Sequence, residues 1–251
     1  KYILMLYMEI YNNDCLEKMK GIESNSIDLL FCDLPYGQTS CKWDSLIDLG
    51  VFWKEVNRIC KDTTPMFFTC STKFGVSLIN SNPKNFRYDL VWVKSAPCGF
   101  LNAKKMPMKK HEMIYVFYRK LPFYDLSSHT HKFLKEDTHS QISREMKAGI
   151  KNLYGNMKGG TIGNIHGTNF DPPLPNSLLE IKSQKGKHAT QKPTELIEWC
   201  LKYYSKEGDT VLDPTMGSGS TGVACKNMNR KFIGIEKDEK IFNVAVERLN
   251  S

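Results

Sequence analysis

The chain has 251 residues, a hydrophobic content of 41% and a formal net charge of +8, which indicates an anionic partner. This length suits one α/β domain with an insertion, and the apolar content is enough for a buried core. The apolar run in Lys1–Tyr7 either extends the first strand or is a non-native leader. Because it is too short for a signal peptide or a membrane-spanning helix, we expect a cytoplasmic protein with no membrane partner.

The spacing of cysteine and histidine argues against a bound metal. None of the eight cysteines forms a Cys-x-x-Cys pair, and His129, His131 and His139 lack metal-like spacing with a cysteine. Several cysteines lie in apolar runs, where a free thiol is usually a small core residue. We therefore expect reduced thiols and no metal.

Two strands are expected in the first part of the chain. Met8–Tyr11 has the pattern of a strand, and a short helix is expected at Leu16–Lys20. The apolar run Ile27–Cys32 is typical of a buried strand, and the proline and glycine of Asp33–Gly37 end it. A carboxylate, a proline and an aromatic ring therefore lie on a tight turn at the carboxyl end of a strand. Ligands bind at that edge in open α/β sheets.

The middle of the chain continues the alternation of strands and helices. Apolar patterning predicts helices at Phe52–Cys60 and Lys73–Asn80, and strands at Met66–Thr69, Tyr88–Lys94 and Met113–Tyr118. The last two strands are expected to be joined by a loop over Ser95–Glu112.

The excess of positive charge lies in one part of the chain. Residues 101–190 hold 15 Lys or Arg and 7 Asp or Glu, whereas the remainder holds 20 of each. Such a segment is expected to meet phosphates, although a solvated basic surface has the same composition. Four lysines fall within seven residues and are the first candidates for phosphate contacts: Lys104, Lys105, Lys109 and Lys110.

From Leu121 to Lys187 the hydrophobic periodicity fades. The segment contains a Gly- and Asn-rich stretch, residues 151–167, and a rigid Pro-rich stretch, Asp171–Pro175. It is either an inserted recognition region or a flexible linker.

The last part of the chain predicts a strand, a glycine-rich turn and a helix. Val211–Asp213 is the strand, and the helix follows over Thr221–Asn227. The Gly-x-Gly-x-x-Gly motif at Gly217–Gly222 permits a tight turn and close approach of the backbone to a ligand. Alone, this motif is shared with nicotinamide-binding folds. A phosphate-binding P-loop is disfavoured because Val223 stands where its lysine would follow the last glycine.

Two helices and a further strand flank the glycine-rich turn. Before it, Pro193 suits the first turn of a helix that would run to about Tyr204. After it, the strand Phe232–Ile235 ends on Glu236, whose carboxylate can hold ribose hydroxyls. A helix over Glu239–Leu249 closes the chain.

The two turns together resemble the motifs of the DNA amino methyltransferases, which use S-adenosylmethionine. The catalytic signature of that family is Asp/Asn/Ser-Pro-Pro-Tyr/Phe. Asp33-Leu34-Pro35-Tyr36 matches three of its four positions, with Leu34 in place of the first proline. The family's cofactor signature, a strand followed by Asp-Pro-x-x-Gly-Ser-Gly, matches Asp213–Gly219. Here the catalytic motif precedes the cofactor motif, as in the β group, a circularly permuted form of the fold.

The resemblance covers nearly the whole chain and implies its fold class. We expect an α/β, Rossmann-like S-adenosylmethionine methyltransferase fold, circularly permuted, with a mostly parallel sheet and an antiparallel strand at the far edge. Residues 1–120 would be the catalytic half, residues 121–187 an inserted DNA target-recognition region, and residues 188–251 the cofactor-binding half of the same domain.

The order of the motifs also implies an order of strands. The strand ending at Asp213 should be central, with the Glu236 strand on one side and the Asp33 strand on the other. The strand ending near Asp14 should lie outside the Glu236 strand. The closing helix, Glu239–Leu249, leads towards that outer strand, which begins near Met8. The two chain ends should therefore be neighbours, and right-handed crossovers make this arrangement feasible.

The resemblance assigns roles to individual residues. The catalytic residues would be Asp33, Leu34, Pro35 and Tyr36. Asp14 is expected at the adenine amine of the cofactor, or it is a plain helix N-cap. The residues expected around the cofactor are Asp14, Cys15, Asp33, Lys192, Pro193, Thr194, Asp213, Pro214, Met216, Gly217, Gly219, Thr221, Glu236 and Lys237. The candidates for DNA contact are Lys42, Lys104, Lys105, Lys109, Lys110, Arg144, Lys147 and Lys151.

The implied reaction transfers a methyl group from S-adenosylmethionine to an exocyclic amine of a base flipped out of double-stranded DNA. Asp33 and the carbonyl of Leu34 or Pro35 can accept the two amine N–H groups, and Tyr36 offers a ring face for stacking. In the family, aspartate in the first position usually accompanies adenine N6 methylation, whereas serine leans towards cytosine N4. We expect adenine and keep cytosine N4 as the alternative.

Three other functions share part of this pattern. A DNA-binding relative without catalysis is disfavoured because Asp33, Pro35, Tyr36, Asp213 and Glu236 are intact. A nicotinamide oxidoreductase is suggested by the glycine-rich turn alone. A protein glutamine methyltransferase usually has Asn first in its signature and the cofactor motif before it. The sequence leaves open the DNA target, a homodimer and a companion restriction endonuclease.

Overall fold

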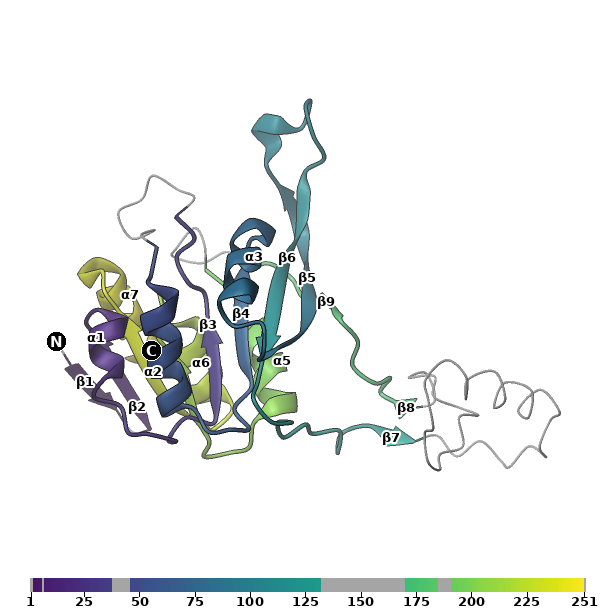
Figure 1. The fold of residues 1–251 in the computed structure, drawn as a ribbon. Helices are drawn as coiled ribbons and strands as arrows, with labels where there is room; N and C mark the ends of the chain where they lie inside the picture. The colour runs from purple at the N-terminus through teal and green to yellow at the C-terminus, as the bar shows by residue number, and fades with distance from the viewer. Residues whose placement is uncertain (1, 6, 38–45, 132–169, 185–190, 251) are drawn as a thin grey trace. The chain divides into compact units, whose positions relative to one another are not determined.

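The computed structural model of the protein describes residues 2–5, 7–37, 46–131, 170–184 and 191–250 (Figure 1). Contacts divide the chain into two units. One contains Lys1–Asp125 and Ser177–Ser251, and the other contains Leu126–Asn176. In the second unit, a short antiparallel pair joins β7 (Thr130–His131) to β8 (Phe170–Asp171).

The larger unit is built on a nine-stranded sheet in its described residues. From one edge to the other, the strands are β1 (Tyr2–Met5), β2 (Met8–Asn12), β11 (Lys231–Glu236), β10 (Thr210–Asp213), β3 (Leu29–Cys32), β4 (Met66–Cys70), β6 (Lys109–Phe117), β5 (Phe86–Cys98) and β9 (Leu178–Glu180). The five strands from β2 to β4 are parallel. β6 is antiparallel to both of its neighbours, and β1 is antiparallel to β2.

Helices cover both faces of this sheet (Figure 1). On one face lie α1 (Cys15–Met19), α2 (Leu49–Ile59) and α3 (Thr72–Ser81), and on the other lie α5 (Thr194–Tyr204), α6 (Ser220–Asn227) and α7 (Glu239–Asn250). β3 and β4 are buried at every residue, as expected for parallel strands covered on both sides. No helix in the described residues is both long and apolar enough to span a membrane.

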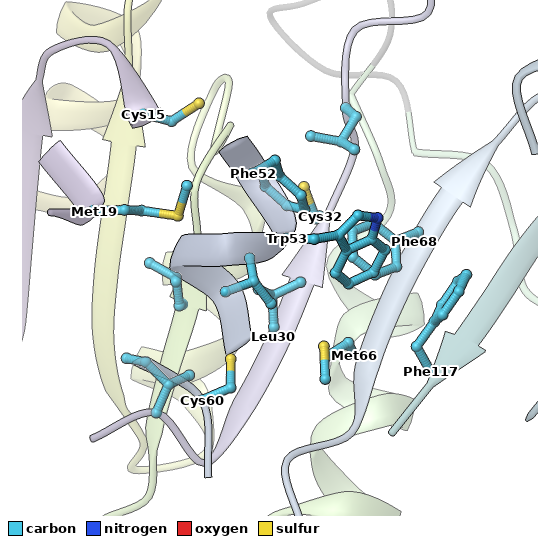
Figure 2. Packing of buried hydrophobic residues seen from close by; sticks show 14 of the residues in the cluster. Cys15, Met19, Leu30, Cys32, Phe52, Trp53, Cys60, Met66, Phe68 and Phe117 are labelled. Carbon is cyan, nitrogen blue, oxygen red and sulfur yellow. The ribbon is translucent and has the colours of Figure 1, made fainter. Parts of the chain in front are cut away.

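An aromatic cluster under α2 forms the core of one face (Figure 2). Phe52 and Trp53 of α2 pack against Phe68 of β4, and the ring centroids of Trp53 and Phe68 are 5.4 Å apart. Trp53 also contacts Phe117 of β6 at 5.2 Å. On the opposite face, Phe67 packs against a tyrosine of α5. The cluster therefore packs α2 against β4 and β6.

The predicted strand order is confirmed. β10 lies between β11 and β3, and β2 lies outside β11. The prediction that the two chain ends are neighbours is wrong for the first described residue. β1 folds back along β2, so Tyr2 pairs with Tyr11 at the carboxyl end of β2. Helix α7 instead ends beside α6, where Lys226 contacts Leu249. The neighbouring arrangement applies to the region of Met8, because α7 packs on β2 and β11.

Two expected boundaries also differ from the structure. Lys109 and Lys110 were expected in a loop, but they lie on β6, which pairs with a β5 longer than expected. Residues 121–187 were expected to form a separate region, but the unit that the contacts separate is shorter, Leu126–Asn176. Leu178–Glu180 instead forms β9 and joins the main sheet beside β5. The seven cysteines in the described residues are free, and six of them are buried.

Candidate active site

A cleft of about 940 Å³ opens at the carboxyl ends of the parallel strands. Carboxylates that follow four strands line it: Asp14 after β2, Asp33 after β3, Asp213 at the end of β10 and Glu236 at the end of β11. Lys192, just before α5, lines it from another side. The structure therefore brings the two sequence motifs, 180 residues apart in the chain, into one cavity.

The glycine-rich turn between β10 and α6 has a backbone that glycine alone adopts readily. Gly217 and Gly219 have positive φ angles of 53° and 79°. A Cβ on Gly217 would meet nothing within 4 Å, so the backbone there is open to the cleft that it lines. At Gly222 a Cβ would lie 2.9 Å from Phe232, which explains how α6 packs so closely on β11.

Asp213 fixes this turn through hydrogen bonds to its carboxylate. Its carboxylate accepts hydrogen bonds from the backbone N–H of Thr215 at 3.1 Å and from the hydroxyl of Thr221 at 2.5 Å. Burial raises the pKa of Asp213 to about 7, although the Thr221 hydroxyl and the Thr215 N–H lower it. Asp213 is 4% exposed, so its carboxylate mainly fixes the conformation of the turn.

Glu236 is fixed at the end of β11. Its Oε2 accepts the backbone N–H of Gly217 at 3.1 Å, and its Oε1 accepts that of Asp238 at 2.8 Å. Burial raises the pKa of Glu236, while these two backbone hydrogen bonds oppose the shift. A carboxylate has about four acceptor positions, so Glu236 keeps acceptor capacity towards the cleft.

Asp14 is the N-cap of α1. Its Oδ1 accepts the backbone N–H of Leu16 at 2.9 Å, and its Oδ2 accepts the Lys237 ammonium at 3.1 Å. Burial alone would raise the pKa of Asp14, but the hydrogen bonds from Lys237 and the backbone lower it, so the carboxylate is ionised near neutral pH. Burial raises the pKa of the adjacent Cys15 thiol to about 12, so that thiol is not a nucleophile at neutral pH.

The carboxylate of Asp33 is held by three donors. Its Oδ1 accepts the hydroxyls of Tyr36 and Thr69, each at 2.5 Å, and its Oδ2 accepts the Lys192 ammonium at 2.5 Å. A fourth contact joins the two motifs, because the Thr215 hydroxyl donates to the backbone carbonyl of Asp33 at 3.1 Å. The Asp33–Gly37 turn is therefore attached to the glycine-rich turn on one side and to β4 on the other.

A chain of alternating charges continues beyond Asp33. The Lys192 ammonium lies 3.6 Å from Oε2 of Glu112, and Glu112 is also paired with Lys94. Burial opposes the charge on Lys192, but the carboxylates of Asp33 and Glu112 prevail and raise its pKa. Lys192 therefore stays protonated inside the cleft.

The hydroxyl of Tyr36 is hydrogen-bonded within the protein. The hydroxyl oxygen of Tyr36 also lies 2.9 Å from the Thr69 carbonyl, so its single proton is shared between that carbonyl and Asp33. The ring packs on Phe74 with centroids 5.4 Å apart. Burial, followed by the charge of Asp33, raises the pKa of Tyr36, so the phenol stays protonated. Its neighbour Leu34 is buried.

Some predicted residues lie in the cleft and others do not. Pro35, Pro214, Met216, Thr221 and Lys237 line it together with the residues described above. Pro193, Thr194 and Gly219 are not part of its described lining. Pro193 caps α5, and the Thr194 hydroxyl contacts Gln184 and Arg248. Lys104 and Lys105 at the β5–β6 turn and Lys109 and Lys110 on β6 are exposed. Lys42, Arg144, Lys147 and Lys151 lie outside the described residues.

Sequence reasoning missed three residues around Asp33. Thr69, Glu112 and Lys94 take part in its network, and Lys192 contacts Asp33, whereas it was expected beside the cofactor. Thr69 closes the predicted strand Met66–Thr69, and the end of a strand adjacent to the Asp33 strand is a signal that could have identified it.

Comparisons with known proteins agree with this geometry. Residues 27–247 match the model of the N6/N4 family of DNA methylases. The Type II methyltransferase M.HinfI of Haemophilus influenzae is 27% identical, over 96% of this chain and 67% of its own length. The DNA adenine methyltransferase YhdJ of Escherichia coli is also 27% identical, over 96% of this chain and 82% of its own.

A solved structure shares the fold. The M1.HpyAVI–SAM complex superposes with a TM-score of 0.63 at 23% identity, covering 96% of this chain and all of that one. The strand order, the helices on both faces and this likeness establish the Rossmann-like methyltransferase fold. Together with the family match over most of its length, they show that this chain belongs to the DNA methylase family.

Proposed function

We propose that this DNA methyltransferase transfers a methyl group from S-adenosylmethionine to the N6 amine of adenine in a base flipped out of duplex DNA. The observation that carries the proposal is the shared cleft. Asp33, on the catalytic turn, and Gly217 and Glu236, on the cofactor side, line the same cavity of about 940 Å³. A base amine and a methyl donor can therefore meet in it.

The cofactor side of the cleft fits S-adenosylmethionine. The open backbone at Gly217 admits a ligand closely, and Glu236 keeps acceptor positions for ribose hydroxyls. The ionised Asp14 can accept an adenine amine while it still caps α1. When bound, the cofactor supplies a methyl group on a sulfonium, from which it leaves easily.

The catalytic turn supplies hydrogen-bond acceptors to the target amine. An exocyclic amine is a poor nucleophile because its lone pair is delocalised into the ring. Asp33 and the carbonyl of Leu34 or Pro35 can accept its two N–H groups, which favours a tetrahedral nitrogen and stabilises the positive charge that develops on it. Three donors already contact Asp33, so the amine takes the remaining acceptor position or displaces one of them.

Two observations favour adenine over cytosine. The first residue of the catalytic motif is Asp33, and in the related family aspartate usually accompanies N6 methylation. The name of YhdJ, which matches most of this chain, states adenine as its target. Cytosine N4 is the second candidate because the matching family includes enzymes of both types.

Analysis of the methylated base tests this proposal. The protein should be incubated with unmethylated genomic DNA and S-adenosylmethionine, and the DNA digested to nucleosides for mass spectrometry. We expect N6-methyladenine; N4-methylcytosine would instead establish the second candidate. Asp33→Ala should abolish the product while calorimetry still detects cofactor binding, because its carboxylate is held by Tyr36, Thr69 and Lys192 and not by the glycine-rich turn or Glu236. Cofactor binding without any methylated base from the native protein would support an inactive DNA-binding relative.

The partners follow from this function as proposals. Double-stranded DNA is the substrate, and the basic residues between Leu101 and Thr190 would contact its phosphates. The segment within residues 121–187 that forms a separate unit, Leu126–Asn176, would recognise the target sequence. A companion restriction endonuclease and a homodimer are further proposals, the former because M.HinfI is named a Type II methyltransferase.

A further inference from the structure

The turn that joins β5 to β6 combines exposed apolar side chains with lysines. We call residues Gly99–Met108 the hairpin tip. In it, Phe100 is 81% exposed and Leu101 is 94% exposed, and two methionines add to the apolar surface. From Ala96 to His111 the sequence contains four lysines and no Asp or Glu. Such contiguous exposed apolar side chains usually mark an interaction site.

The hairpin tip begins at the wall of the active-site cleft. Ala96, Pro97 and Cys98, the last residues of β5, line the cleft together with Asp33. Cys98 pairs with Lys109, and the tip follows at once, beyond the ends of the other strands (Figure 1). A positive φ of 91° at Gly99 turns the chain into the short helix that presents Phe100 and Leu101. The hairpin tip therefore continues the strand pair whose inner part forms one wall of the cleft that Asp33 lines.

The charge of the tip indicates the chemistry of its partner. A hydrophobic protein surface would leave Lys104, Lys105, Lys109 and Lys110 without counter-charges. A DNA duplex offers phosphates to the lysines and a base stack to the apolar side chains. Side chains such as Phe, Leu and Met are the types that enter between base steps.

We propose that Phe100 and Leu101 form an apolar wedge that enters the DNA stack where the target base leaves it, while Lys104 and Lys105 hold the flanking phosphates. The wedge would fill the space vacated by the base and so favour the flipped state. This proposal rests on the proposed function, because base flipping is what creates the space. It extends that function by assigning to Phe100 and Leu101 the stabilisation of the flipped state, which phosphate contacts by lysines would not provide.

Binding to a duplex with a gap in its stack tests the wedge. Two DNA duplexes of the same arbitrary sequence, one intact and one with a single abasic residue, are compared by fluorescence polarisation. Insertion into the abasic duplex avoids the cost of unstacking a base, so the native protein should bind it about tenfold more tightly. Phe100→Ser with Leu101→Ser should bind both duplexes alike. The matched control, Lys104→Gln with Lys105→Gln, should weaken binding to both and keep the ratio.

Each other outcome overturns the proposal. A ratio near one for the native protein would show that nothing enters the gap. A ratio retained by the Phe100→Ser, Leu101→Ser variant would place the inserting group elsewhere. If sedimentation showed that this variant separates a native dimer into monomers, the tip would be a self-association surface. Unfolding is a small risk because both side chains are exposed, and an unchanged affinity for S-adenosylmethionine checks it.

The assay also separates this proposal from the proposed function. It requires neither a recognition sequence nor methyl transfer, so an abasic preference can be measured even if nucleoside analysis detects no methylated base. Conversely, N6-methyladenine formation together with equal binding of the two duplexes would retain the proposed function and refute the wedge.

Discussion

Lys192 holds Oδ2 of Asp33, whereas Tyr36 and Thr69 both hold Oδ1. It is the cation between Asp33 and Glu112, and its side chain is 11% exposed. Lys192→Met should leave two carboxylates facing each other, shift Asp33 and reduce kcat by about 10²-fold, with a smaller change in the KM for cofactor. Steady-state kinetics with both substrates provides the measurement.

Two matched variants distinguish positioning from general damage to the fold. Lys192→Arg keeps the charge and should recover part of kcat. Lys94→Met removes a cation from Glu112 without touching Asp33, so its effect should be smaller. Equal losses in Lys94→Met and Lys192→Met would contradict a specific role of the Asp33–Lys192 pair.

Glu236 carries the second prediction at this scale. Glu236→Ala should weaken binding of S-adenosylmethionine by about 1–3 kcal/mol in calorimetry, because ribose hydroxyls lose an acceptor. The substitution also removes the partner of two backbone N–H groups, so thermal unfolding must be measured in parallel. Glu236→Gln keeps a carbonyl acceptor and should lose less. Unchanged affinity in Glu236→Ala would remove the residue from the cofactor site.

The residues that could be predicted from the sequence are those at strand ends. Asp33 and Glu236 follow apolar runs, so their place at one edge of the sheet followed from the alternation of strands and helices. The pairing of Asp33 with Lys192 could not be predicted in this way. These residues are 159 positions apart, and their contact depends on how the segment before α5 meets the end of β3.

At the scale of elements, the β5–β6 hairpin shows why a loop was expected where strands continue. The outer parts of both strands, near Cys98 and Lys109, are exposed on both sides, so their sequence has no apolar alternation. Pairing that becomes irregular between Val93 and Cys98 holds these outer parts together. The helices were easier to predict, because α2 and α5 each bury an apolar stripe. Their observed ends differ from the predicted ends by few residues.

The β10–α6 turn makes a prediction about pH. Burial raises the pKa of Asp213 from its ordinary 3.8 to about 7. Because the folded-state pKa is the higher one, protonated Asp213 contributes stability below about pH 4, and this contribution is lost as the pH rises to about 7. The Asn side chain of Asp213→Asn stays neutral. The free energy of unfolding of this variant, relative to that of the native protein, should therefore increase as the pH rises from about 4 to about 7. Denaturant unfolding at several pH values measures the difference, and parallel curves would contradict the raised pKa.

For the whole molecule, the order of motifs predicted the order of the central strands. β3, β4 and β10 carry apolar runs, and carboxylates that follow β2 and β3 or end β10 and β11 lie at one edge of the sheet. The edge strands were harder to predict. β1 was left undecided, and β9 has three residues, of which only the middle one is buried. Short edge strands depend on pairing with a neighbour that their own sequence does not specify.

The distribution of charge leads to the last prediction. The basic excess lies within Leu101–Thr190, and the described part of it includes four exposed lysines on the β5–β6 hairpin: Lys104, Lys105, Lys109 and Lys110. Replacing all four with Gln should reduce the slope of log K against log salt by up to about 3.6, since each phosphate contact contributes about 0.9. Different DNA sequences should be affected almost equally, because phosphate contacts carry no base information.

A control with the same change in charge decides whether position matters. Lys84, Lys206, Lys226 and Lys231 are exposed near the amino ends of β5, β10 and β11, at the edge of the sheet opposite the cleft. Replacing these four with Gln lowers the net charge by the same amount but removes no phosphate contact, so the salt slope should stay near the native value. Equal slopes for the two quadruple variants would mean that overall charge attracts the DNA and that its phosphates follow another path across the protein.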